Sequence, residues 1–254
     1  MIEVIHISKH FGEKEVLKDI SLSFDPGRVH QVIGRSGSGK TVLMKCMVGL
    51  EEVNAGEIRY DGRVFSTLSQ TQRRGIRREM GMLFQGGALF DFMNVEQNVE
   101  FPLVMNTDMK PAERKKRVAF CLERVNLPNT QHLMPSELSG GMIKRVAIAR
   151  AIALNPRYLF CDEPNSGLDP QTAHLIDGLI AELTREYNMI TVVNTHDMNS
   201  VIEIGDDVCF IHEGQLWWRG SREEVLNTSN PELNAFVFST GLTKRLKNNQ
   251  NNGI

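Results

Sequence analysis

The stretch Gly34-Arg35-Ser36-Gly37-Ser38-Gly39-Lys40-Thr41 decides the fold of this chain. It matches the pattern G-x-x-x-x-G-K-[ST] and lies between the predicted short strand 29–33 and the segment 41–50, which has helical spacing. In that context the loop N–H groups and the helix N-terminus surround phosphate oxygens. A glycine-rich turn that binds nothing is the alternative, and the flanking strand and helix argue against it. We therefore predict a phosphate site in which Lys40 contacts the β- and γ-phosphates and the Thr41 hydroxyl contacts Mg²⁺.

The loop and the first helical residues supply the predicted contacts to the nucleotide. These residues are Gly34, Arg35, Ser36, Gly37, Ser38, Gly39, Lys40, Thr41 and Val42. Val42 has no hydroxyl, so one possible side-chain contact to the α-phosphate is absent, whereas the backbone contacts do not depend on the side chain.

Downstream of this loop, short apolar segments alternate with segments of helical spacing. The expected strands and helices lie at 80–84, 141–154, 158–161, 172–187 and 190–194. Such an alternation favours an α/β fold with a mostly parallel sheet and helices on both faces. Asp61-Gly62 and Glu213-Gly214 each separate two short strand patterns, so we expect a hairpin at both places.

The region between the strand 80–84 and the helix 141–154 has a different character. Prolines punctuate residues 86–138, and only 112–125 has strong helical spacing. We therefore expect a helical subdomain, about residues 86–155, inserted into a single α/β domain that spans residues 1–240. Residues 241–254 are rich in Asn and Lys, and we expect them to be a disordered polar tail.

The composition excludes several functional classes. The 254 residues are 41% hydrophobic and 24% charged, which is ordinary for a globular protein. The balance of 29 basic and 31 acidic residues gives 29 − 31 = −2, which argues against a nucleic-acid partner. No apolar run approaches the ~18 residues of a membrane span, and the N-terminus does not have the pattern of a secretory signal. The four cysteines form no C-x-x-C pair, which favours reduced thiols in the cytosol.

Two adjacent acids follow the apolar strand 158–161. Asp162 at the strand end can support Mg²⁺, and Glu163 lies one residue further, where a carboxylate can polarise an attacking water as general base. Two acids at a strand end can also form only a solvated turn. The phosphate loop, which lies upstream in the same chain, favours the catalytic interpretation.

The segment Leu138-Ser139-Gly140-Gly141 directly precedes a helical pattern. Its hydroxyl and backbone N–H groups can form a second anion site, although Ser139 as a simple helix N-cap explains the segment equally well in isolation. Its position is more informative than its composition. It stands one helix and one strand before the acid pair; Gln85 and His196 each follow a predicted strand, and the segment 166–169 reads Ser-Gly-Leu-Asp.

This order of motifs resembles the ATP-binding subunits of ABC transporters over roughly residues 2–225. The resemblance implies a P-loop NTPase core of the ABC ATPase type, with an N-terminal antiparallel β region and the inserted helical subdomain. It implies an Mg²⁺-dependent ATP hydrolase in which Phe11 stacks on adenine and Val16 lines the same pocket. It further implies that Gln85 contacts Mg²⁺ and the attacking water, and that His196 holds the γ-phosphate and orients Glu163.

The resemblance also implies an assembly. Ser139, Gly140 and Gly141 are expected to bind the ATP held by a second copy, so that two ATP molecules lie between two antiparallel chains, with Asp169 contacting the partner. A separate membrane permease is expected to receive the motion of this dimer. That places the chain in the cytoplasm, peripheral to the inner membrane. Soluble ABC ATPases that act on DNA or ribosomes are the alternative class, but their coiled-coil insertions, zinc modules or fused cassettes are absent from this sequence.

Four stretches are similar to the ATPases of Mla-type phospholipid transport systems, namely 83–91, 98–103, 138–142 and 195–201. This similarity implies phospholipid as cargo, an MCE-type lipid-binding subunit as partner and a small accessory subunit as a further one. The alternative is a transporter for another solute, because the permease selects the cargo. Asn165 is unusual after Glu163-Pro164, and we expect it to have no contact with the chemistry.

Two surface features complete the sequence-based expectations. The apolar residues of the segment 86–106 that can contact a permease or pack inside the subdomain are Leu89, Phe90, Phe92 and Met93. Among these, Phe92 is the best candidate for exposure. A basic cluster is predicted to be a solvated helix face, with attraction to anionic lipid or a permease loop as the alternative; its members are Arg73, Arg74, Arg77 and Arg78.

Overall fold

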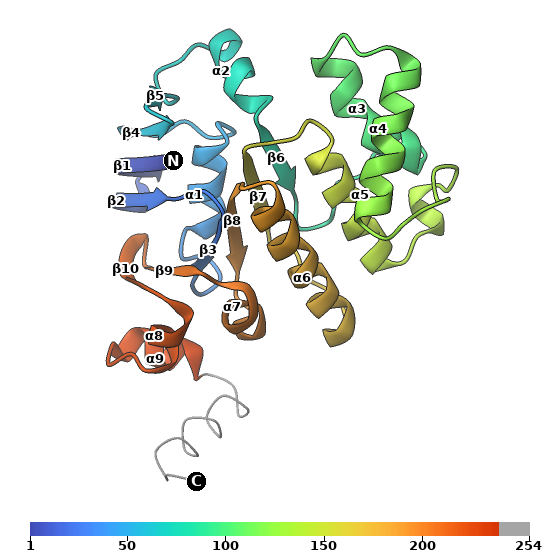
Figure 1. The fold of residues 1–254 in the computed structure, drawn as a ribbon. Coiled ribbons are helices and arrows are strands. Elements are labelled where there is room, and N and C mark those ends of the chain that lie inside the picture. Colours follow the sequence, from blue (N-terminus) through green and yellow to red (C-terminus); the bar gives the residue numbers. More distant parts are fainter. Residues whose placement is uncertain (239–254) are drawn as a thin grey trace.

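A six-stranded sheet with the order β10-β9-β3-β8-β7-β6 lies at the centre of the computed structural model, which describes residues 1–238 (Figure 1). Its strands are β3 (Arg28–Ile33), β6 (Met80–Leu83), β7 (Tyr158–Asp162), β8 (Ile190–Thr195), β9 (Asp207–His212) and β10 (Gln215–Gly220). The first five of these run parallel to their neighbours, and β10 pairs with β9 as an antiparallel hairpin. The predicted parallel sheet is therefore confirmed. Residues 241–254, the expected polar tail, lie outside the described residues.

A second, antiparallel sheet with the order β2-β1-β4-β5 stands beside the first. It consists of β1 (Ile2–Phe11), β2 (Lys14–Phe24), β4 (Ala55–Tyr60) and β5 (Arg63–Val64). Helix α1 (Lys40–Met47) belongs with both sheets, because Leu43 and Met44 share one buried apolar cluster with Ile7 of β1 and Val32 of β3. The phosphate loop, which leads into α1, is thus held where the two sheets pack against this helix. Both predicted hairpins are present, as β4–β5 and as β9–β10.

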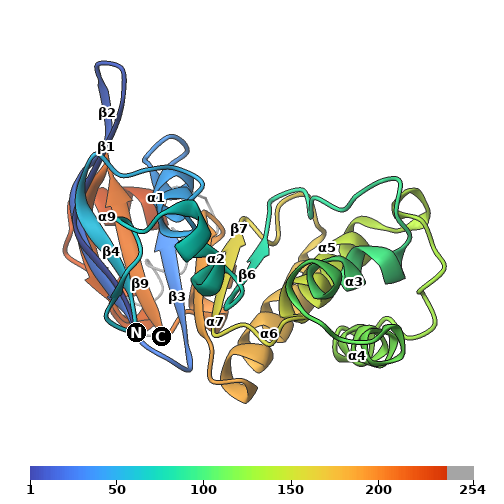
Figure 2. The same ribbon diagram turned by 90° about the horizontal axis from the view of Figure 1, so that it is seen from above.

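The insertion between β6 and β7 is helical, as expected, and it projects to one side of the sheets (Figures 1 and 2). It contains α3 (Val95–Asn106), α4 (Pro111–Arg124), the short 3-10 turn Pro135–Glu137 and α5 (Gly140–Ile152). The remaining helices are α2 (Gln70–Arg77), α6 (Pro170–Glu186), α7 (Met198–Ile204), α8 (Arg222–Leu226) and α9 (Pro231–Val237). Within residues 1–238 no helix is both long and apolar enough to cross a membrane.

Helix α3 lies within the expected helical subdomain but was not predicted as a separate helix, and Pro102 is one of the prolines that punctuate this region. The helix forms because Asn94 and Gln97 cap its start reciprocally, while Val95, Val99 and Leu103 recur every four residues and are all buried. Pro102 removes a single helical hydrogen bond. Burial of the apolar stripe outweighs that loss.

The basic cluster was predicted to be a solvated helix face, and this is wrong for two of its four members. Arg73 is only 3% exposed; it forms an ion pair with Glu52 and donates to the carbonyls of Phe65 and Ser66. Arg77 donates to the Gly49 carbonyl at 2.8 Å. These guanidinium groups fasten α2 to the end of α1 and to the β5 loop, since a guanidinium offers several donors to nearby carbonyls. Arg74 and Arg78 are exposed.

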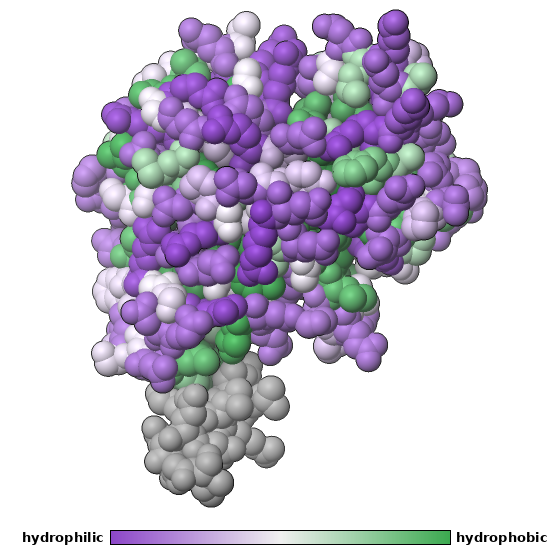
Figure 3. Space-filling model, viewed as in Figure 1, coloured by the Kyte–Doolittle hydropathy of each residue, from purple (hydrophilic) through white to green (hydrophobic). Residues whose placement is uncertain are grey.

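Polar residues cover most of the face seen in Figure 3, and apolar residues occur there in small groups. The expected exposure of Phe92 is confirmed, because 75% of the residue is accessible. Leu89 packs against the subdomain core, and Phe90 is half-buried between the rings of Phe92 and Phe101. The side chains of this segment therefore divide between the core and the surface.

Candidate nucleotide site

The parallel strands bring the predicted site residues to one edge of the central sheet. The loop 34–39 follows β3, Glu163 directly follows β7, and His196 directly follows β8. Because β7 and β8 pair in parallel, as do β8 and β3, these three carboxyl ends are adjacent. Such an edge is where ligands bind in open α/β sheets.

Two glycines hold the loop against its supports. A Cβ atom on Gly34 would lie 2.3 Å from the Ile211 carbonyl oxygen, and one on Gly214 would lie 2.4 Å from the Val16 carbonyl oxygen. The Gly214 amide donates to the Ser38 carbonyl at 3.1 Å, and the Gly214 carbonyl accepts from the Lys18 amide at 2.8 Å. The β9–β10 turn therefore supports the phosphate loop from behind and joins it to β2.

Lys40 is buried at the base of this loop. Its Nζ donates to the carbonyls of Gly34 at 2.8 Å and Arg35 at 3.2 Å. Burial lowers the pKa of this ammonium, while the carboxylates of Glu163 and Asp162 act in the opposite direction. A cation held in a region of low dielectric interacts more strongly with a phosphate than one in bulk water does.

Hard oxygen atoms lie beside Lys40. The Thr41 hydroxyl is 3.4 Å from Asp162 Oδ1, which also accepts from Asn194 Nδ2 at 3.0 Å. Hydroxyl and carboxylate oxygens suit Mg²⁺, which usually takes one or two protein ligands together with phosphate oxygens and water. In residues 1–238 no group of three or more His, Cys, Asp or Glu could hold a metal alone. The donor set therefore fits a magnesium ion that arrives with a nucleotide.

Glu163 and His196 form a pair in which Nδ1 of the imidazole lies 2.8 Å from the carboxylate Oε2. The Glu163 side chain is 15% exposed and the His196 side chain 65% exposed, so the carboxylate is shielded and the imidazole faces the open site. Glu163 has φ +49°, a backbone conformation that few residues other than glycine adopt. Its amide donates to the Asn194 carbonyl at 2.9 Å, which ties the acid to β8.

These groups surround one cavity of about 820 Å³. The predicted residues that line it are Phe11, Val16, Arg35, Ser36, Gly37, Gly39, Lys40, Thr41, Val42, Gln85, Glu163 and His196. Gly34, Ser38 and Asp162 do not line it. Within residues 1–238 the buried Ser38 hydroxyl has no hydrogen-bond partner. A buried hydroxyl without a partner fits a loop that binds an anion.

Ser139, Gly140 and Gly141 do not line this cavity. They begin α5, where the Ser139 hydroxyl accepts from the Met142 amide as N-cap. Ser139 and Gly140 are accessible, whereas a Cβ atom on Gly141 would lie 2.5 Å from a Thr172 methyl carbon. The chain thus presents this second anion site outward. Asp169 caps the start of α6 through the amides of Gln171 and Thr172.

Several residues of the site were not predicted. Lys14 and Phe236 line the cavity, and Lys144 of α5 is buried where its Nζ donates to the Gln85 carbonyl and, at 3.4 Å, to the Glu163 carbonyl. Lys14 lies between Phe11 and Val16, so proximity to them could have indicated it. Phe236 belongs to a C-terminal helix without a motif, and no local pattern indicates it.

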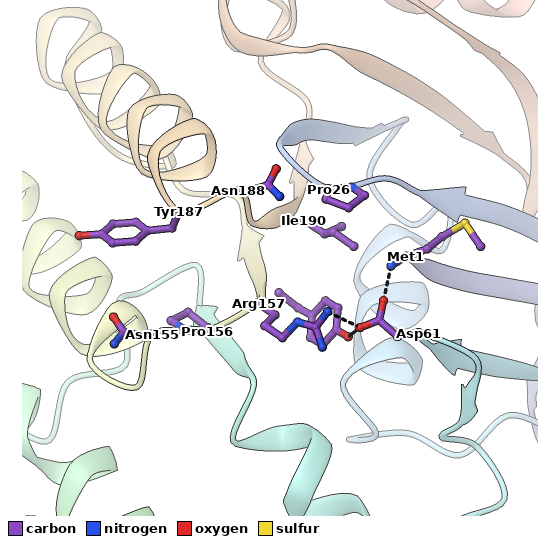
Figure 4. Close-up of a pocket in the computed structure, with 10 residues that line it drawn as sticks. Met1, Pro26, Asp61, Asn155, Pro156, Arg157, Tyr187, Asn188 and Ile190 are labelled. Carbon is purple, nitrogen blue, oxygen red and sulfur yellow. Dashed lines mark hydrogen bonds and ion pairs between the residues drawn. The ribbon is translucent and has the colours of Figure 1, made fainter.

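A second cavity, of about 310 Å³, lies at the opposite edge of the sheet, where β7 and β8 begin (Figure 4). Asp61 points into it and accepts from the Tyr158 hydroxyl at 2.7 Å and from Arg157 at 2.8 Å, and it also pairs with the amino group of Met1. The carboxylate is satisfied by the chain itself. This cavity therefore offers none of the phosphate chemistry found at the other edge.

Comparisons with known proteins agree with this geometry. The family described as ABC transporter matches residues 17–166. A methionine import ATP-binding protein, MetN of Clostridioides difficile (strain 630), is 38% identical over 93% of this chain and 74% of its own length. A probable ribonucleotide transport ATP-binding protein, mkl of Mycobacterium leprae (strain TN), is 35% identical over 93% of this chain and 68% of its own length.

Solved structures show the same fold. The dimeric structure of MJ0796, a bacterial ABC transporter cassette, has a TM-score of 0.81 and 31% identity, covering 87% of this chain and 99% of that one. A further structure of MJ0796, in a post-hydrolysis state with ADP and Pi, has a TM-score of 0.80 over the same shares.

The chain is an ATP-binding protein of the ABC transporter family. Its fold is the P-loop fold of ABC ATPases, with an antiparallel N-terminal sheet. It is an ABC-type ATPase, and it uses ATP and Mg²⁺.

Proposed function

We propose that Glu163, oriented by His196, acts as the general base of ATP hydrolysis in the 820 Å³ cavity. The 2.8 Å pair across that cavity is the observation that carries this proposal. A shielded carboxylate beside an imidazole can polarise a water molecule in line with the γ-phosphate. Lys40 offsets the negative charge that develops on the phosphate oxygens. Mg²⁺, held by Thr41, Asp162 and Gln85, would add further positive charge.

The remaining site residues position the nucleotide. Phe11 is 46% exposed at the rim of the cavity, which suits a ring that stacks on adenine, and Val16 lies beside it. Residues 34–42 enclose the phosphates. These roles place the adenine ring at the Phe11 end of the cavity and the γ-phosphate at the end with Glu163, Gln85 and His196.

The active unit in this proposal is a dimer. Ser139 and Gly140 are accessible at the start of α5 and lie outside the chain's own cavity, so a second copy has to approach for them to reach a nucleotide. Gly141 and Asp169 take part in the same contact. The similar cassette MJ0796 has a dimeric structure, which supports the same arrangement here.

A membrane permease is the second proposed partner. A groove of about 400 Å³ lies between β6, α3 and α5 and is lined mainly by apolar side chains, including Phe84, Phe90 and Phe101. Phe84 is 38% exposed, and Phe92 nearby is 75% exposed. A cytoplasmic segment of a permease can insert there. Its position would then be coupled to movement of Gln85, which follows Phe84. This arrangement places the protein on the cytoplasmic face of the inner membrane, with one domain over residues 1–240 and a subdomain over 86–155.

The cargo proposal follows the relatives. MetN is named for methionine import, and mkl for ribonucleotide transport, so the comparisons favour a transporter for a small solute over the phospholipid inferred from sequence. Phospholipid remains the second candidate because of the stretches 83–91, 98–103, 138–142 and 195–201. The phospholipid candidate requires an MCE-type lipid-binding subunit and a small accessory subunit. Neither cargo candidate includes a nucleic-acid partner.

The substitution Glu163→Gln tests the catalytic proposal. The variant is expected to bind ATP with unchanged affinity, to lose at least ~100-fold in turnover because one essential proton acceptor is absent, and to accumulate as a dimer in size-exclusion chromatography with ATP. Hydrolysis at the wild-type rate would remove Glu163 as the base. A monomer with bound ATP would contradict the dimer.

Purification of the tagged protein from detergent-solubilised native membranes separates the cargo candidates. A permease recovered with a soluble solute-binding protein supports the small-solute proposal. A permease recovered with an MCE-type subunit supports phospholipid instead. Both results leave the catalytic assignments unchanged.

A further inference from the structure

The half-buried side chain of Asn165 and the buried side chains of Asp177 and Ser200 are joined by hydrogen bonds close to the catalytic edge. Asn165 Nδ2 donates to Asp177 Oδ2 at 2.7 Å, and the Ser200 hydroxyl donates to Asp177 Oδ1 at 3.0 Å. Gln31 Nε2 on the central strand β3 donates to the Ser200 carbonyl at 3.0 Å. We call Asn165, Asp177 and Ser200 the carboxylate link.

The carboxylate link joins two segments that are far apart in the sequence. Asn165 lies two residues after Glu163, Ser200 lies four residues after His196, and Asp177 lies on α6, between them in sequence. The link therefore connects the loop that carries the acid to the helix that follows the histidine. The functional pair, Glu163 Oε2 and His196 Nδ1, depends on the spacing of the same two segments.

The acid needs such a support because its backbone is strained. Glu163 has φ +49°, and a residue stays in that region only when its surroundings fix it. On one side the Glu163 amide is tied to Asn194. On the other side, the Asn165 side chain is the attachment to α6. Loss of that attachment lets the loop relax, and the carboxylate moves away from the imidazole.

The composition of the link argues against simple core filling. Asp177 is 2% exposed and Ser200 fully buried, and a buried carboxylate is expensive where apolar side chains would fill the space. Among residues 1–238, the donors to Asp177 are the neutral Asn165 and Ser200, and the charges that act on it come from Asp197, which caps α7, and from Glu203 of α7. The Cys161 thiol of β7 interacts with it as well. Asn165 Oδ1 is itself buried and has no hydrogen-bond partner among the residues that the structure describes. A buried polar group without a partner calls for an explanation, and orientation of the adjacent loop supplies one here.

We propose that the carboxylate link is a positioning device for ATP hydrolysis: Asn165 and Asp177 hold Glu163 at the distance from His196 that the base requires. This inference rests on the proposed role of Glu163. It leaves in place the sequence-based expectation that Asn165 has no contact with the chemistry, because the proposed effect of Asn165 is indirect. None of the three residues lines the nucleotide cavity, so each acts through Glu163 and His196.

The test compares Asn165→Ala, Asp177→Ala and Asp177→Asn in steady-state ATP hydrolysis by the full chain. Both alanine variants are expected to lower kcat about 10-fold with KM for ATP within ~2-fold, because displacement of a catalytic group by a fraction of an ångström affects turnover and not nucleotide affinity. Asp177→Asn retains an acceptor for Asn165 and a partner for Ser200, and it is expected to keep kcat within ~2-fold. The double alanine variant should lose no more than either single variant, since both break one link.

Asn199→Ala is the matched control, because Asn199 is an exposed asparagine next to Ser200. It is expected to leave kcat and KM unchanged. A kcat of Asn165→Ala within ~2-fold of wild type would overturn the proposal, as would an equal loss in Asp177→Asn and Asp177→Ala. If Asp177→Ala does not fold, Asn165→Ala and Asp177→Asn decide the matter. A wrong assignment of Glu163 as the base gives a different result: Glu163→Gln would then hydrolyse ATP at the wild-type rate, independently of the rates of the Asn165 and Asp177 variants.

Discussion

The substitution Asp177→Asn is predicted to stabilise the protein by an amount that grows as the pH rises. Burial raises the pKa of the Asp177 carboxyl from 3.8 to about 6, whereas the hydrogen bonds from Ser200 and Asn165 act in the opposite direction. Between these two pH values the native protein keeps a proton that the unfolded chain has released. The penalty for burying the charge is therefore absent at low pH, grows as the pH rises, and is complete above pH about 6. An asparagine at this position carries no such penalty at any pH.

The size of the effect follows from the two pKa values. A difference of about 2 corresponds to ~3 kcal/mol of destabilisation in the wild type at pH 8 and ~1.6 kcal/mol at pH 5. The free energy of unfolding of Asp177→Asn, measured relative to wild type, should thus increase by ~1.4 kcal/mol from pH 5 to pH 8. Changes in hydrogen bonding add a constant offset and do not alter this increase.

Urea unfolding of both proteins at constant ionic strength, without nucleotide, measures the difference at several pH values. Asp108→Asn, which removes an exposed aspartate between α3 and α4, controls for the loss of one negative charge. A stability difference that varies by less than ~0.3 kcal/mol between pH 5 and pH 8 would show that Asp177 is ionised in the native as well as the unfolded state across this range. That result would refute the account of a desolvated carboxylate.

Two further predictions concern the nucleotide site. Lys144→Met removes the donor that ties α5 to the carbonyls of Gln85 and Glu163, so kcat should fall about 10-fold. The thermal midpoint should change little, because an apolar chain replaces a buried cation. An unchanged kcat would show that this contact does not matter to turnover. Phe11→Ala should weaken ATP binding, measured by calorimetry, by about 10-fold, because it removes base stacking worth ~1–3 kcal/mol. The variant should retain kcat at saturating ATP, and the control variant Phe11→Tyr should bind ATP with normal affinity. Equal affinities for Phe11→Ala and wild type would exclude the ring as the adenine contact.

Much of the site could be predicted because its parts are local in sequence. Lys40 and Thr41 were predicted from the spacing of one loop. In the structure Lys40 is buried against the loop carbonyls, and the exposed Thr41 lies beside Asp162. The resemblance to ABC ATPases implies that Glu163 and His196 act together. In the structure each follows a strand of the parallel sheet, and such strands end at the same edge. The topology then fixes which ends are neighbours.

The errors share a different physical origin. Arg73 looks like a surface residue in a polar helix, and only the approach of Glu52 from a separate loop makes it a buried anchor. Helix α3 was not predicted as a separate helix. Pro102 is a local signal against a helix, whereas the burial of Val95, Val99 and Leu103 depends on α4 and α5. Local patterns carry no information on which distant segment will supply a partner.

The buried charged groups near the site have a common arrangement. Lys40 is bonded to the carbonyls of Gly34 and Arg35, Lys144 to those of Gln85 and Glu163, and Asp177 to the amide of Asn165. Each binds a loop that follows a strand. Such loops lack a ladder of backbone hydrogen bonds, so side chains from elsewhere must set their positions. Motifs in the sequence identify the loops that do the chemistry, and Lys40 belongs to such a motif, but Lys144 and Asp177 come from helix positions outside any motif. Substitutions of these helix residues should therefore alter turnover without altering any motif.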